Sequence, residues 1–184
     1  PMPEVHPSAI LDGDVTLADD VVIGPYCVLT GPIESGAGTR LIGNAYLQGP
    51  LRLGERNLVY PFACLGFAPQ HAKYDPREPG LGTEIGDDNV FREYTSVHRA
   101  FTQDGPTRIG SHGWFMTEAH VGHDSQVGDH VTRSSAVVVL LGGGGVGAHG
   151  AAIERALVGE LEQDLRGDDL GDDAGQLIGR ATTE

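Results

Sequence analysis

The chain has few basic residues, few cysteines and no long apolar run. Among its 184 residues, 12 Lys and Arg oppose 26 Asp and Glu, and the formal net charge of −14 argues against nucleic acid or an anionic membrane as a partner. The two cysteines, Cys27 and Cys64, are expected to be free thiols rather than a disulfide. No apolar stretch approaches the roughly twenty residues of a membrane span, and no basic start resembles a signal peptide, so we expect one cytoplasmic domain.

An apolar residue recurs on every sixth position, which we call the hexad position. The hexad positions are Val5, Leu11, Leu17, Ile23, Leu29, Leu41, Leu47, Leu53, Val59 and Leu65, then Ile85, Phe91, Val97, Ile109, Phe115, Val121, Val127 and Val139. Only Ser35 interrupts the first run. Amphipathic helices repeat apolar residues near 3.6 and half-buried strands near 2, whereas a period of six is typical of a parallel β-helix.

The hexads predict a three-sided prism of short parallel strands. The hexad residue and a usually small residue four places later point inward. Three hexads, about eighteen residues, make one coil, and coils stack at the strand spacing of roughly 4.8 Å, so residues 5–140 form about seven or eight coils. Glycine directly follows seven hexad residues, which we attribute to sharp corners that need backbone freedom.

We expect an all-β fold with a short C-terminal α-helix. The β-helix would cover 1–148, a helix 149–166 and a flexible acidic tail 167–184. The helix is indicated by apolar residues at four-residue spacing, namely Ile153, Leu157, Leu161 and Leu165. Such a helix would cap the last coil, whose backbone groups are otherwise unpaired.

Two interruptions of the hexads predict projecting loops, at 66–84 and 98–108. Both are rich in polar residues and proline or glycine, and loops on a rigid scaffold are where functional sites concentrate. His98, His120 and His123 lie beside them in the sequence. A single exposed histidine is usually an ordinary surface residue, but three histidines near two loops and an aspartate indicate a site.

The histidine motif resembles that of a known family. The segments EIGDDNVFREYTSVHRA at 84–100 and AHVGHDSQVGD at 119–129, after PQHAKY at 69–74, resemble the UDP-N-acetylglucosamine acyltransferases of lipid A biosynthesis. Shorter matches are HPSAI at 6–10, IGPYCV at 23–28 and PFACLG at 61–66. The resemblance implies a left-handed parallel β-helix, assembled as a homotrimer with sites between neighbouring chains.

The resemblance also implies a reaction. A 3-hydroxyacyl group would pass from acyl carrier protein to the 3-hydroxyl of UDP-N-acetylglucosamine. His123 matches the general base, and an imidazole with its ordinary pKa of about 6.5 offers a neutral nitrogen for this work. No cofactor or metal is expected, because a thioester is already activated.

The resemblance assigns further residues to the site. Asp124 matches the acid beside the base, where it either orients the histidine or makes a structural hydrogen bond; neighbouring strand residues tend to point apart. The expected substrate-binding residues are Gln70, His71, Lys73, Tyr74, His98, Arg99 and His120. A local basic patch of Lys73, Arg92, Arg99 and Arg108 could offset the repulsion between this acidic chain and an acidic carrier protein.

Three departures from the family leave alternatives open. His71 replaces an acid, Leu141–Gly145 replaces a glycine–histidine pair, and the acidic segment after 140 stands where the family has further coils and a basic helical domain. A non-catalytic trimeric β-helix is therefore one alternative. A zinc enzyme of the γ-carbonic anhydrase type is another, although its histidine spacing of five differs from the spacings of three and seven here.

Overall fold

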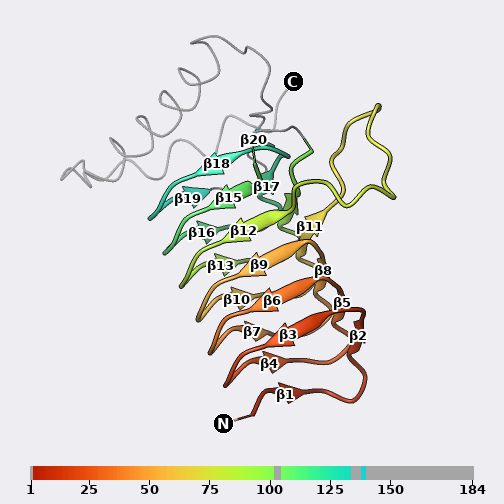
Figure 1. Cartoon of the computed structure of the whole chain (residues 1–184). Helices are drawn as coiled ribbons and strands as arrows, with labels where there is room; N and C mark the ends of the chain where they lie inside the picture. Colours follow the sequence, from red (N-terminus) through yellow and green to blue (C-terminus); the bar gives the residue numbers. More distant parts are fainter. Residues whose placement is uncertain (1, 102–104, 134–137, 140–184) are drawn as a thin grey trace, which may run out of the picture. The chain divides into compact units, whose positions relative to one another are not determined.

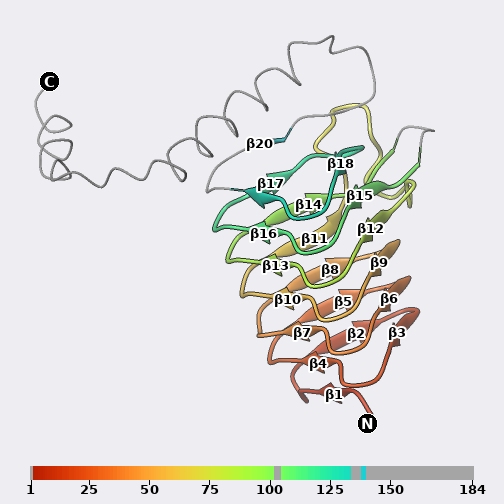
Figure 2. The ribbon, with the colours of Figure 1, turned by 90° about the vertical axis from the view of Figure 1, so that its left-hand side faces the viewer.

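The computed structural model describes residues 2–101, 105–133 and 138–139, which form one stack of short strands. This part of the chain contains no helix, and so none that is long and apolar enough to span a membrane. The helix and tail predicted for 149–166 and 167–184 lie outside the described residues and stay predictions. The all-β, left-handed parallel β-helix is confirmed (Figures 1 and 2).

The strands form three parallel sheets, one for each face of the prism. Face A contains β1 (Glu4–Val5), β4 (Val22–Ile23), β7 (Arg40–Leu41), β10 (Leu58–Val59), β13 (Val90–Phe91), β16 (Trp114–Phe115) and β19 (Thr132–Arg133). Face B contains β2 (Ile10–Asp12), β5 (Val28–Thr30), β8 (Tyr46–Gln48), β11 (Cys64–Phe67), β14 (Ser96–His98), β17 (His120–Val121) and β20 (Val138–Val139). Face C contains β3 (Val15–Leu17), β6 (Ile33–Ser35), β9 (Leu51–Leu53), β12 (Thr83–Ile85), β15 (Thr107–Ile109) and β18 (Gln126–Val127).

The hexad residues form the interior of the prism, as predicted. From Ile23 to Val127 they are buried, and Phe91 stacks on Phe115 with ring centroids 4.8 Å apart. Val5 and Leu11 are exposed, because the first coil has a neighbouring coil on one side alone in the described structure. The inward position is therefore set by the repeat, and in the first coil it does not by itself bury the side chain.

Two asparagines inside the prism link successive coils. Asn57 and Asn89 stand four residues after a hexad position and are buried. The Oδ1 of Asn57 accepts the N–H of Asn89 at 3.0 Å, and the Oδ1 of Asn89 accepts the N–H of Gly113 at 2.7 Å. Their amide groups donate to the carbonyls of Gly86 and Gly110 at 2.9 and 3.0 Å. The two side chains thus satisfy backbone groups at a corner, where no strand ladder can do so.

Among the glycines after hexad positions, Gly66 has the left-handed backbone that the sharp-corner prediction requires, with φ at 80°, but others serve a different purpose. Gly24 and Gly86 have no positive φ; instead, a Cβ on Gly24 would lie 2.2 Å from the carbonyl oxygen of Ile42, and one on Gly86 would lie 2.8 Å from that of Gly110. The glycines permit close approach of stacked coils. The left-handed corner conformation falls on other residue types, including Asp20, Asn44 and Asp124, and none of these described positions is β-branched.

Two loops leave the prism at the corner between faces B and C. Residues 68–82 connect β11 to β12, and residues 99–106 connect β14 to β15. In Figure 1 the first loop projects from the upper coils. The loops are joined by an antiparallel bridge between Gly82 and Ala100, with the N–H of Leu81 donating to the carbonyl of Ala100 at 2.9 Å. This corner is where the chain departs from a regular prism.

Candidate active site

The three predicted histidines meet at the corner that carries the loops. His98 ends β14 and His120 begins β17 on face B, and their ring centroids lie 5.0 Å apart. His123 follows β17 in the turn toward face C. Because β14 and β17 are adjacent parallel strands, the fold brings together His98 and His120, which are 22 residues apart in the sequence.

His123 is held by its neighbour in the sequence. Its Nδ1 lies 2.6 Å from the Oδ2 of Asp124, and the side chains are 18% and 5% exposed. The two residues do not point apart as strand neighbours would, because they occupy a corner and Asp124 has a φ of 62°. A carboxylate accepts the proton of Nδ1, which leaves Nε2 with a lone pair. No described residue hydrogen-bonds that Nε2, so it can accept a proton from a bound molecule.

Asp124 also makes the structural hydrogen bonds that were the alternative to orienting the histidine. Its Oδ1 accepts the N–H of Phe101 at 3.2 Å, and its own N–H donates to the Oγ1 of Thr107 at 2.9 Å. The residue therefore does both: one carboxylate oxygen faces the imidazole and the other faces the second loop.

His98 and His120 are partly desolvated neighbours of His123. Burial lowers the pKa of His98, and burial together with the nearby His98 and His123 rings lowers the pKa of His120. The Nδ1–H of His98 donates to the carbonyl of Ala68 at 2.6 Å, so the Nε2 of the neutral ring is an acceptor. The Nδ1 of His120 lies 2.8 Å from the Oγ of Ser96. The two neutral rings can hydrogen-bond a polar ligand without adding charge.

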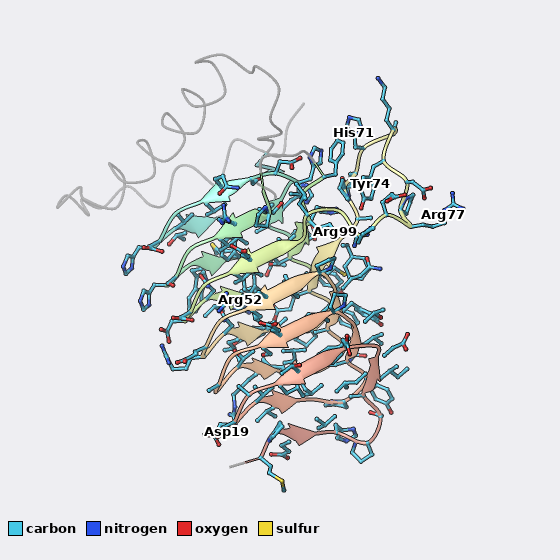
Figure 3. All side chains as sticks on the ribbon, viewed as in Figure 1. Asp19, Arg52, His71, Tyr74, Arg77 and Arg99 are labelled. Atoms are coloured by element: carbon cyan, nitrogen blue, oxygen red, sulfur yellow. The ribbon has the colours of Figure 1, made fainter. Side chains whose placement is uncertain are left out.

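The first loop brings two of its four predicted site residues to His123 or its neighbours. The ring of His71 lies 5.9 Å from that of His123, and the hydroxyl of Tyr74 donates to the carbonyl of Glu78 within the loop. Gln70 and Lys73 are exposed, and the N–H of Lys73 donates to the Nδ1 of His71 at 3.3 Å. Figure 3 shows His71 and Tyr74 on the projecting loop.

Arg99 lies beneath the first loop rather than on the site's surface. The residue is 2% exposed, and its guanidinium donates to the carbonyls of Gly66 at 3.2 Å and Glu78 at 3.1 Å. It also donates to the Oε1 of Gln48 at 3.0 Å. Figure 3 shows Arg99 at the base of the loop, where it connects the loop to the prism. These contacts give Arg99 a role in anchoring the loop, and its predicted contact with substrate stays a prediction.

Sequence reasoning missed Phe101. Its ring lies 5.0 Å from that of His123, 4.8 Å from that of His71 and 5.5 Å from that of Tyr74. An apolar residue outside the hexad pattern, two residues after a histidine–arginine pair, was the available signal. Phe101 was passed over because its contacts come from residues distant in the sequence.

Most of the cationic side chains expected to form a basic patch are paired with an acid or buried. Arg92 pairs with Glu93 at 2.9 Å, Arg108 pairs with Glu84 at 2.9 Å, and Arg99 is buried. Within the described residues, Lys73 alone of the four has neither an acidic partner nor burial. The described ranges also contain no group of three or more His, Cys, Asp or Glu side chains arranged to hold a metal ion, so the zinc alternative gains no support.

The sequence is similar to several curated acyltransferases. The acyl-[acyl-carrier-protein]–UDP-N-acetylglucosamine O-acyltransferase of Syntrophobacter fumaroxidans is 41% identical over 141 residues, which are 76% of this chain and 53% of that protein. The same-named protein of Saccharophagus degradans is 42% identical over 127 residues, 68% of this chain and 48% of that protein. The chain spans about half the length of the curated relatives it matches. No protein-family profile matches the sequence.

The fold is similar to solved structures of UDP-N-acetylglucosamine acyltransferases, which are also called LpxA. LpxA of Acinetobacter baumannii has a TM-score of 0.65 and 42% identity, covering 70% of this chain and 49% of that one. UDP-N-acetylglucosamine O-acyltransferase of Moraxella catarrhalis has a TM-score of 0.64 and 39% identity, covering 68% of this chain and 48% of that one. Over about 70% of its length, this chain therefore belongs to the UDP-N-acetylglucosamine acyltransferase family.

Proposed function

We propose that this chain carries the acyl-transfer centre of a UDP-N-acetylglucosamine O-acyltransferase. It would move a 3-hydroxyacyl group from acyl carrier protein to the 3-hydroxyl of UDP-N-acetylglucosamine, the first step of lipid A biosynthesis. The observation that carries this proposal is the His123–Asp124 pair at 2.6 Å, set beside two neutral histidines and beneath a projecting loop. Family membership supports the choice of substrates.

His123 is the general base of the proposed reaction. Its Nε2 takes the proton of the sugar 3-hydroxyl while that oxygen bonds to the thioester carbonyl carbon. The carbon–sulfur bond then breaks, and the imidazolium returns the proton to the leaving thiolate of the carrier. Asp124 keeps the other proton on Nδ1 and stabilises the imidazolium that forms between the two steps. Because the proton comes back, the enzyme ends unchanged.

The remaining site residues position the substrates. His98 and His120 offer neutral nitrogens for hydroxyl and carbonyl groups, which suits an uncharged reacting centre. Gln70 and Lys73 are exposed on the loop and can contact the nucleotide or the carrier. The ring of His71 packs near that of His123, and Arg99 contributes by hydrogen-bonding the loop. Such alignment of two substrates contributes rate beyond the base itself.

We propose that the working form is a homotrimer. Exposed aromatic residues gather at the corner between faces A and B, where Tyr94 stacks on Phe62 at 5.2 Å and Tyr26 occupies the same corner on a lower coil. Apolar patches of this kind mark protein interfaces. A neighbouring copy seated there would stand beside face B, which bears His98 and His120, and would form the second wall of the site.

We also propose a cytoplasmic location and a reaction without a cofactor. Cys27 and Cys64 are both free, which fits a reducing compartment. The thioester supplies the activated acyl group, and the described site supplies a base. Nothing in the proposed chemistry therefore calls for a metal or a redox group.

A transfer assay tests the proposal. Purified protein is mixed with 3-hydroxyacyl carrier protein and UDP-N-acetylglucosamine, and the acylated sugar nucleotide is measured for wild type, His123→Ala and the control His130→Ala. Loss of a positioned base lowers the rate by about 10²–10⁴-fold, whereas the exposed His130 lies outside the site. Equal rates for wild type and His123→Ala refute the role of His123.

Light scattering distinguishes the remaining alternative. A protein that forms trimers yet gives no product from the two substrates of the transfer assay would support the non-catalytic β-helix. The double substitution Phe62→Glu and Tyr94→Glu places charge in the exposed aromatic corner and is expected to yield monomers without transfer. Trimers that survive this change contradict the proposed interface.

A further inference from the structure

Phe101 connects the first loop to the proposed base. Its ring touches the imidazole of His123 with centroids 5.0 Å apart and planes at 68°. On its other side it contacts His71 at 4.8 Å and Tyr74 at 5.5 Å, both from the loop at 68–82. The ring is thus shared between the element that carries the base and the element that projects over it.

Main-chain hydrogen bonds hold the backbone at Phe101 independently of its side chain. The N–H of Arg99 donates to the carbonyl of Phe67 at 2.9 Å, and the N–H of Ala100 donates to that of Gly82 at 3.0 Å. The N–H of Phe101 then donates to the Oδ1 of Asp124 at 3.2 Å. Three consecutive residues are therefore tied to the prism, the loop and the carboxylate in turn.

These contacts restrict His123 in two ways. The N–H of Phe101 occupies one oxygen of the Asp124 carboxylate, so the other oxygen stays directed at the Nδ1 of His123. The phenyl ring meets the imidazole edge to face, which opposes rotation of the imidazole about its χ torsions. The first contact fixes which nitrogen bears the proton, and the second fixes where the other nitrogen points.

We propose that Phe101 is a positioning residue for the general base and couples the placement of the loop at 68–82 to the orientation of the His123 ring. The proposal rests on the proposed function of His123. Substrate that orders His71 and Tyr74 then also orders the base, because all three rings pack on Phe101. The hydroxyl of the sugar would meet a correctly turned Nε2 only when the loop is in place.

Two substitutions at Phe101 isolate the contribution of the ring, since both keep the backbone N–H. Phe101→Leu removes the aromatic contacts, and Phe101→Tyr retains them. An edge-to-face contact of ordinary strength corresponds to about a 2- to 10-fold effect, so Phe101→Leu is expected to lower kcat by that factor with little change in KM. Phe101→Tyr is expected to restore the wild-type kcat. His112→Asn, which removes an exposed ring from a stacked pair outside the site, is the matched control.

Nuclear magnetic resonance of labelled histidines gives a readout independent of turnover. In wild type, the ring protons of His123 and His71 are expected to be shifted upfield by the phenyl ring, and the nitrogen signals of His123 to report one tautomer with the proton on Nδ1. Phe101→Leu is expected to abolish the shift and mix the tautomers, and Phe101→Tyr to preserve both.

The two readouts separate the inference from the function on which it rests. Wild-type protein without transfer, but with the spectral changes in Phe101→Leu, refutes the proposed function and leaves the positioning intact. Unchanged kcat together with unchanged His123 signals in Phe101→Leu overturns the inference. Faster hydrogen exchange at Leu81 and Ala100 in Phe101→Leu, with the His123 tautomer and kcat unchanged, would show that the ring only anchors the loop, and this also overturns the inference.

Discussion

Two groups of histidines occupy different corners of the same prism. At the corner between faces C and A, His112 and His130 stack in adjacent coils, with ring centroids 4.8 Å apart, and both are exposed. At the corner between faces B and C, His98, His120 and His123 are partly or fully buried, and a carboxylate holds one of them. The residue type and the repeat are the same at both corners.

The difference lies in what covers the rings. His112 has an acid nearby, with its Nδ1 3.8 Å from the Oδ2 of Asp88, but Arg56 already binds that carboxylate at 2.8 Å and lowers its pKa. Solvent surrounds this corner. At the other corner the side chains are less exposed, so burial lowers the pKa of His98 and His120, and a carboxylate faces His123. A histidine in this fold becomes chemically useful through its covering loops.

The largest expected effect comes from the carboxylate that distinguishes the loop-covered corner. Asp124→Asn keeps the shape of the side chain but weakens its hold on the Nδ1 proton of His123. Misplacing a reacting group by about an ångström costs about 10²-fold in rate, so kcat should fall by about that factor. Steady-state kinetics with the substrates of the transfer assay measures it. A kcat within twofold of wild type would mean that Asp124 serves structure alone.

Removing the anchor of the first loop tests whether covering the histidines matters. Arg99→Ala deletes hydrogen bonds from a buried guanidinium to Gly66, Glu78 and Gln48. Hydrogen bonds to charged groups contribute about 1.5–3 kcal/mol, and the loss should appear as faster hydrogen exchange across 68–82. Arg77→Ala, which breaks an exposed pair with Asp75 on the same loop, is the control and should leave exchange at Leu81 unchanged.

Acid should distinguish the two corners through stability. Since burial lowers the pKa of His98 and His120, the unfolded chain binds protons below about pH 6.5 that the folded chain does not. The free energy of unfolding therefore falls as the pH drops through that value, and levels off below the folded pKa values. Denaturant titrations at several pH values measure this slope. His98→Gln should flatten it, and an unchanged slope would show that His98 titrates as an ordinary surface group.

The smallest effect is expected at the exposed corner. His130→Asn removes one ring of the stacked pair, and asparagine tolerates the left-handed backbone at that residue, where φ is 55°. Surface substitutions of this kind stay within about 0.5 kcal/mol, measured by denaturant unfolding. Transfer activity should match wild type. A large loss of stability or of transfer activity would show that the exposed pair of His112 and His130 has a structural or functional role.

Much of the fold could be predicted because its periodicity is local. Every hexad residue from Ile23 to Val127 is buried where the six-residue period places it. The period also places Asn57 and Asn89 inward, but it does not show that their amides bond the corner carbonyls of the next coil. Gly24 and Gly86 were noticed but misinterpreted: the backbone that they approach is 18 or more residues away, and the sequence shows no distance between coils.

The candidate site was predicted in part. His98, His120 and His123 were singled out by their position beside two predicted loops and given roles by a resemblance, and the structure brings them to one corner. Phe101 was missed, and the anchoring contacts of Arg99 were not foreseen, because packing between two loops decides both. The alternation argument for Asp124 failed because it assumed a strand where the chain turns.

By itself, the sequence determined the parallel β-helix and the position of its interior, because the six-residue repeat is a local pattern that recurs in every hexad. The sequence also identified the histidines of the candidate site, because they lie beside two interruptions of that repeat. Only the tertiary structure decided which side chains meet. Loops that the repeat does not govern bring Phe101 to His71 and Arg99 to Tyr74 from separate parts of the chain, and burial in the folded chain lowers the pKa of His98 and His120. Contact and desolvation depend on distances through space, which no local pattern records.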